Sequence, residues 1–93
     1  MSESSEDLGL IMVLVQRLET QRLPRARALK DKVDRGELLN SFDLGFLEEV
    51  FAETNSIRPL LAQHPEYQEL AARMMHLYKE ITDRGLQNEK ESR

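Results

Sequence analysis

The chain has 93 residues, of which 40% are apolar and 32% are charged, and its formal net charge is −4. This length allows one ordinary domain, and the composition is globular and typical of highly charged helical proteins. Because the sequence contains no cysteine, it excludes disulfides, thiolate catalysis and cysteine-based metal sites, and it is consistent with a reducing compartment.

The N-terminal residues are acidic and rich in serine, where a secretion signal would be basic. We therefore expect residues 1–6 to form a disordered tail and the protein to be cytoplasmic. The apolar run that follows covers only residues 8–15, far short of the roughly 20 residues that cross a bilayer. Residues 8–22 have helical spacing, and the first two turns are apolar on nearly every side, which indicates a helix buried on more than one face.

Pro24 interrupts this pattern at a point where it can either begin a second helix or kink one long helix. The apolar spacing continues through Leu29 and Val33 to Gly36, which is suited to cap the C-terminus of a helix. We therefore expect helical structure over residues 8–35, either as one kinked helix or as two.

Asn40 and Asp43 have the spacing of a capping box, which predicts that a helix starts at Asn40. Apolar residues then recur at helical spacing to about residue 63. Pro59 lies within this stripe without changing its phase, so the pattern favours a helix kinked at Pro59 over a helix that ends there.

Pro65 suits the first position of the last helix. Between Tyr67 and Ile81 the apolar residues alternate steps of three and four, which is the clearest amphipathic pattern in the chain. Gly85 is expected to end this helix, which would leave residues 87–93 as a frayed polar tail.

These segments together predict an all-α fold, a small antiparallel bundle of three long helices. The helices would cover roughly residues 8–35, 40–63 and 65–85, and the short connections between them would make neighbouring helices antiparallel. The bundle is expected to form a single domain over residues 7–86.

The first helix holds six successive apolar residues, more than a three-helix monomer needs for one core stripe. We expect one face of the helix to pack internally and another face to meet a second chain, either an identical subunit or another protein, with Ile11, Leu14, Val15 and Leu18 in the core or in the contact. The residues predicted for that interface, including one from the last helix, are Leu10, Met12, Val13, Leu14 and Met75. The alternative is a central helix that is wrapped by its own neighbours.

The segment 17–35 holds seven basic and three acidic side chains, which raises a second hypothesis, a nucleic-acid-associated regulator. Its predicted phosphate contacts are Arg22, Arg25, Arg27 and Lys32. Against this hypothesis, the charges spread around the helix, no aromatic residue is interleaved to stack on bases, and the whole chain is acidic.

The same basic side chains can instead pair with acidic residues of the next helix, which contains Glu48, Glu49 and Glu53. Opposite charge would then help to set the pairing of the two helices within the chain. Under this interpretation nucleic acid is an unlikely partner.

The sequence contains no motif that predicts catalysis or metal binding. His76 and Glu80 lie one turn apart, but two ligands do not make a metal site. The glycines are isolated, so there is no phosphate-binding loop, and the serines near the N-terminus lack a base that could orient them. We therefore expect a non-catalytic interaction, regulatory or accessory protein that works as a homodimer, without metal, cofactor, small-molecule substrate or membrane partner.

Overall fold

A computed structural model of the chain describes residues 5–92, with side chains from Leu8 onward. The elements are α1 (Ser5–Arg17), a π-helical turn (Leu18–Arg22), α2 (Leu23–Asp34), α3 (Ser41–Ile57), a 3₁₀ turn (Pro59–Leu61) and α4 (Pro65–Glu91). The predicted all-α bundle is confirmed. Residues 1–4 of the expected N-terminal tail lie outside the described residues, and α1 already begins at Ser5.

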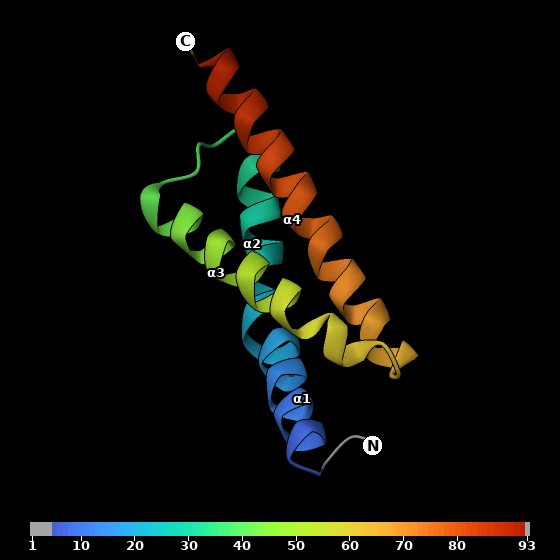
Figure 1. Cartoon of the computed structure of the whole chain (residues 1–93). Coiled ribbons are helices and arrows are strands. Elements are labelled where there is room, and N and C mark those ends of the chain that lie inside the picture. Colours follow the sequence, from blue (N-terminus) through green and yellow to red (C-terminus); the bar gives the residue numbers. More distant parts are fainter. Residues whose placement is uncertain (1–4, 93) are drawn as a thin grey trace.

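The helices form an elongated bundle. Figure 1 shows α1 and α2 in one long column, α4 running parallel to α2 beside it, and α3 crossing them in the opposite direction. The molecule measures 55 × 18 × 16 Å, and its radius of gyration of 15.1 Å exceeds the roughly 12 Å expected for a compact domain of this length. The first turns of α1 lie at one end of this long body (Figure 1).

All the helices contribute to one apolar core. The buried apolar side chains are Ile11, Val15, Leu18, Leu23, Ala26, Leu29, Val33, Phe46, Leu47, Val50, Ile57, Leu61, Ala71, Met74 and Ile81. Of the four residues of the first helix that were expected in the core or in the contact, Ile11, Val15 and Leu18 are therefore in the core, and Leu14 packs against it.

The chain passes Pro24 by widening the helix. The Leu23 N–H donates to the Leu18 carbonyl, five residues back, and the backbone at Arg22 and Leu23 stays helical. In a regular α-helix a proline ring clashes with the carbonyl four residues earlier and leaves that carbonyl without its donor. The π turn changes the spacing just ahead of Pro24, so α1 and α2 follow each other without a non-helical residue between them.

The connection between α2 and α3 is set by the two predicted caps. Gly36 has a φ of 87°, and the N–H groups of Gly36 and Glu37 donate to the carbonyls of Val33 and Lys32 at 3.0 and 3.2 Å. This is the Schellman arrangement, which needs a residue that tolerates positive φ. At the start of α3, the Asp43 N–H donates to Asn40 Oδ1 at 2.8 Å and the Asn40 N–H donates to Asp43 Oδ2 at 3.1 Å, so the capping box is confirmed.

The prediction of a helix kinked at Pro59 is wrong. The α-helix ends at Ile57, and the chain then tightens into the 3₁₀ turn, where the Leu61 N–H donates to the Arg58 carbonyl at 3.1 Å. Pro59 has no N–H to continue the α-helical ladder, and its ring disfavours the regular α geometry. Leu61 is still buried, so the apolar stripe keeps its phase through the turn as expected.

The expected end of the last helix at Gly85 is also wrong, because α4 continues to Glu91. Gly85 is buried, and a Cβ built on it would lie 2.7 Å from Leu39 Cδ1, so the missing side chain makes room for Leu39. Asn88, within the supposed frayed tail 87–93, is 4% exposed. Its Nδ2 donates to the carbonyl oxygens of Val33 at 2.7 Å and Glu37 at 3.2 Å, and this bond pair fastens the last turns of α4 to the end of α2.

Replacing Asn88 by alanine is expected to lower the free energy of unfolding by about 1 to 3 kcal/mol, because the carbonyls of Val33 in α2 and Glu37 in the following loop would lose their donor. Urea denaturation followed by circular dichroism measures the change. The neighbouring exposed residue provides a control, since Gln87→Ala should change the free energy by less than about 0.5 kcal/mol. Equal effects of the two substitutions would contradict the role assigned to Asn88.

Candidate interaction surface

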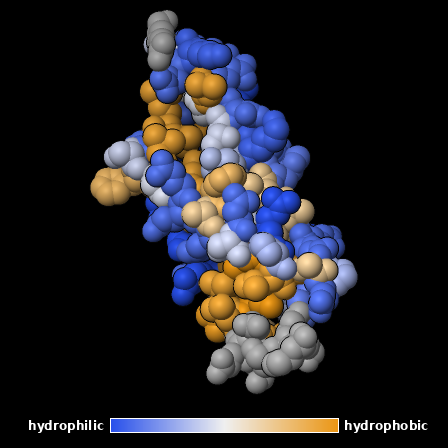
Figure 2. Space-filling model, in the orientation of Figure 1, coloured by the Kyte–Doolittle hydropathy of each residue, from blue (hydrophilic) through white to orange (hydrophobic). Residues whose placement is uncertain are grey.

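The first helix carries an exposed apolar surface. From Leu8 to Gln16 the chain has no charged residue. Within this stretch Ile11 and Val15 are buried, whereas Leu10, Met12 and Val13 are 51%, 55% and 55% exposed. Figure 2 shows the resulting cluster of apolar side chains at the α1 end of the molecule.

The exposed residues lie on both sides of the buried stripe. Successive residues of an α-helix are about 100° apart, so Leu10 and Val13 fall on one side of Ile11 while Leu8 and Met12 fall on the other. Leu14 is half-buried and packs against the core beside Leu10. The structure thus brings together four of the five residues predicted for the interface, and it leaves three of them largely exposed.

Sequence reasoning missed Leu8, which is 39% exposed and lies one turn before Met12. It also missed Arg17, which follows the apolar stretch and whose side chain is 44% exposed. Leu8 lies four residues before Met12, and Arg17 lies four residues after Val13. This helical spacing was a signal that could have identified both Leu8 and Arg17.

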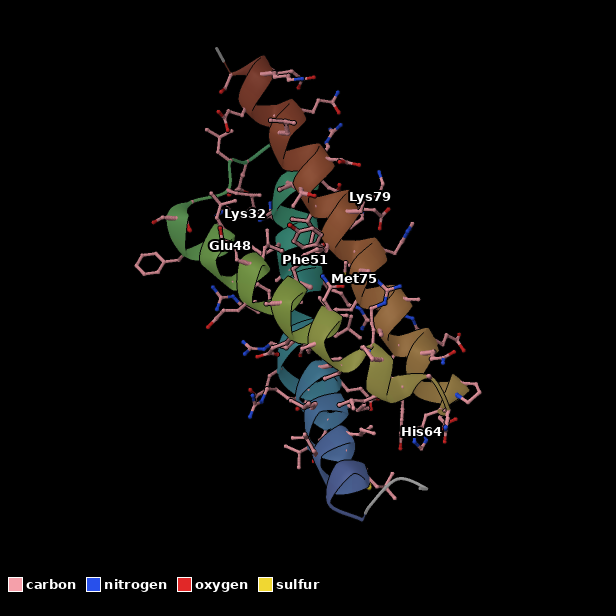
Figure 3. The ribbon with its side chains drawn as sticks, in the orientation of Figure 1. Lys32, Glu48, Phe51, His64, Met75 and Lys79 are labelled. Carbon is pink, nitrogen blue, oxygen red and sulfur yellow. The ribbon has the colours of Figure 1, made fainter. Side chains whose placement is uncertain are left out.

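The fifth predicted residue, Met75, lies elsewhere. It is half-buried on α4, where Figure 3 shows it beside α3. There it lines a hollow of about 460 Å³ together with Arg58, Leu61 and Ala71, and no residue of α1 is among the lining residues. Met75 therefore does not share a surface with the exposed residues of α1.

Most of the predicted nucleic-acid contacts are engaged within the chain. Arg22 Nη2 lies 2.9 Å from Glu53 Oε2, and Arg22 Nε donates to Glu53 Oε1 at 3.3 Å, so α3 holds this guanidinium at two points. The Arg25 guanidinium lies 4.4 Å from the centre of the Phe46 ring, a cation–π contact. Both contacts join the basic segment to α3, and the pair of Arg22 with Glu53 is of the kind that the interpretation of internal charge pairing predicts.

Lys32 is engaged as well. Its Nζ lies 2.6 Å from Asp43 Oδ2, and Figure 3 shows Lys32 where α2 approaches the start of α3. Of the four predicted phosphate contacts, Arg27 alone is exposed without a partner among the described side chains. Of the three acids predicted to pair, Glu53 does so, whereas Glu48 and Glu49 are exposed.

The described residues contain no group of three or more side chains that could hold a metal ion. His76 Nε2 and Glu80 Oε1 lie 3.6 Å apart as an isolated pair on the exposed side of α4. Among the helices within residues 5–92, none combines the length and apolar character needed to span a bilayer.

Comparison with known proteins found no match to any protein-family model, curated protein or solved structure.

The ion pair at the start of α3 gives a prediction of pH dependence. Burial raises the pKa of the Asp43 carboxyl, but the hydrogen bonds from Lys32 and the Asn40 N–H, with the charges of Lys32 and Arg25, outweigh it and hold the pKa below its usual 3.8. A carboxyl with a lowered pKa in the folded state stabilises the fold above its unfolded-state value, and this stability is lost as the pH falls through the folded-state value.

We therefore expect Asp43→Asn to lower the free energy of unfolding at neutral pH and to make it fall less steeply than in the wild type as the pH drops past 3.8. Urea denaturation at a series of pH values measures both effects. The exposed Glu49→Gln is the control and should leave the pH profile unchanged. Profiles of the same slope for the wild type and Asp43→Asn would contradict the contribution of this ion pair.

Proposed function

We propose that this protein is a non-catalytic interaction protein, with a regulatory or accessory role, that works as a homodimer through the exposed apolar surface of α1. One observation carries the proposal. Leu10, Met12 and Val13 are each more than half exposed in a helix stretch that has no charged residue.

Exposed apolar area of this kind favours association. Removing it from water contributes about 25 cal/mol per Å², against the loss of translational and rotational freedom on binding. Single exposed apolar residues are ordinary on a protein surface, but contiguous groups mark interaction sites. On α1 the exposed residues form two neighbouring pairs, Leu10 with Val13 on one side of the buried stripe and Leu8 with Met12 on the other.

The shape of the molecule supports the same proposal. The bundle is 55 Å long and at most 18 Å across, so its own helices cover one face of α1 and leave the others open. The alternative of a first helix wrapped by its own neighbours would require Leu10 and Val13 to be buried within the single chain, and they are not.

The proposal predicts that Val13→Glu weakens self-association by roughly tenfold or more, which corresponds to at least about 1.4 kcal/mol. The reason is that a charge would be buried without a partner in the interface. Analytical ultracentrifugation over low to high micromolar protein concentrations measures the dissociation constant. Circular dichroism should show unchanged helicity, because Val13 is 55% exposed in the single chain and outside its core.

The matched control is Leu86→Glu, since Leu86 on α4 is 56% exposed and lies outside α1. This variant should dimerise like the wild type. A wild type that stays monomeric at high micromolar concentration would overturn the homodimer, and equal weakening by both variants would show that the contact is not specific to α1.

A further inference from the structure

The charges of the first helix are arranged in a fixed order. Acidic residues stand at its N-terminal end, at positions 6 and 7, and nine residues without charge follow. Arg17 then closes the stretch, and the next basic residue is Arg22. Read along the helix, the order is acidic, apolar, basic.

Four positions of this series share one face of α1. At about 100° per residue, positions 6, 10, 13 and 17 fall within an arc of roughly 60°. The centre of that arc points about 140° away from the mean direction of the buried residues Ile11, Val15 and Leu18. The exposure agrees with this geometry, since Leu10 is 51% exposed, Val13 is 55% exposed and the Arg17 side chain is 44% exposed.

The series is also symmetric about its centre. The midpoint of the apolar run 8–15 lies between residues 11 and 12, and so does the midpoint of positions 6 and 17. If a second copy of α1 is laid antiparallel across this midpoint, Leu10 of each copy lies beside Val13 of the other, and position 6 lies beside Arg17. A parallel copy would instead place Arg17 beside Arg17 and the acidic ends beside each other.

Arg17 is available for such a contact. Its nearest carboxylate within the chain is Glu53, with Nη1 and Oε2 3.9 Å apart. Arg22 holds the same carboxylate oxygen at 2.9 Å. Glu53 is therefore neutralised by Arg22, and the guanidinium of Arg17 keeps most of its hydrogen-bonding capacity for another chain.

From this arrangement we infer that the face of α1 that holds Leu10, Val13 and Arg17 binds the same face of a second copy in antiparallel orientation, with the acidic end of each helix beside Arg17 of the other. This inference rests on the proposed homodimer and specifies its geometry. The contact is the same on both copies, as a two-fold axis requires. Because α1 has 13 residues and is only about 20 Å long, the contact is smaller than standard interfaces of about 1,200–2,000 Å², and we expect dissociation in the micromolar range.

Site-directed disulfide formation tests the orientation, because the chain has no cysteine of its own. The variants are Glu6→Cys and Arg17→Cys in the full chain, oxidised separately and as an equal mixture at high micromolar concentration. In an antiparallel pair, two copies of position 6 lie about 17 Å apart along the axis, as do two copies of position 17, whereas a disulfide needs Cα atoms within about 7 Å. In a dimer of the two variants, the cysteine introduced at position 6 of one chain lies beside the cysteine introduced at position 17 of the other. The remaining pair, Arg17 of the first chain and Glu6 of the second, is unchanged.

We expect the mixture to give a disulfide-linked dimer between the two variants in at least about fivefold higher yield than either variant alone, with the link confirmed by mass spectrometry of peptides. Efficient linking of each variant to itself would show a parallel pair and overturn the inference. A dimer in ultracentrifugation that gives no link in any sample would also overturn it, while leaving the proposed homodimer in place. Monomers throughout the concentration range would instead remove the homodimer itself.

Charge reversal provides a second readout that does not depend on oxidation. We expect Arg17→Glu to weaken the dimer and Glu6→Lys to restore it when the two changes are combined in one chain. Arg27→Glu, at an exposed basic position of α2, is the control and should dimerise like the wild type. Failure of the combined variant to dimerise better than Arg17→Glu, with the same helicity in both, would overturn the pairing of acidic end and Arg17.

Discussion

The rest of the structure depends on the π turn at Leu18–Arg22. In regular α-helical register Leu23 would lie roughly 140° around the helix from Leu18. Both residues are nevertheless buried in the same core, at 6% and 2% exposure. The wider turn therefore keeps the apolar stripes of α1 and α2 on one face. Because of it, one continuous column can pack against the 3₁₀ turn through α1 and along α4 through α2.

This continuity has a consequence for the surface. At its α1 end, this column extends past the part of the bundle where α2 packs on α4 (Figure 1). Along α1, Ile11 and Val15 face the core, and the remaining sides of the helix keep their apolar residues in contact with water. The excess of apolar residues in the first helix is thus not absorbed by the fold, and a second chain is the simplest means of covering it.

The parts of the fold that sequence predicted are those fixed by residues close together in the chain. Asn40 and Asp43 are three residues apart, and Gly36 caps the helix that directly precedes it, so their spacing was sufficient. The end of α4 was predicted wrongly because a glycine after an apolar stripe is typical of a helix C-terminus. Gly85 instead lies within α4 and makes room for Leu39. Asn88 donates a hydrogen bond to the carbonyl of Val33, which is 55 residues away in the sequence, and no local pattern predicts that contact.

On the candidate surface, the exposed residues of α1 were predicted because the first helix has more apolar residues than one core stripe needs. Sequence reasoning assigned Met75 to the wrong surface, because the position of that side chain depends on which face of α4 the core covers. Sequence also left Leu23 out of the core, since only the π turn brings it into phase. A single sequence does not show where a side chain lies relative to the helices that pack around it.

The helix dipole explains the acidic residues at the start of the first helix, but it does not explain the position of Arg17. Acidic residues at a helix N-terminus stabilise the helix, so positions 6 and 7 need no partner to be explained. A basic residue is stabilising at a C-terminus, but the helical ladder does not end at Arg17. It continues through the π turn into α2, and its exposed carbonyls lie near Asp34 and Arg35. Since Arg22 already neutralises Glu53, the proposed pairing with the acidic end of another α1 would account for the position of Arg17.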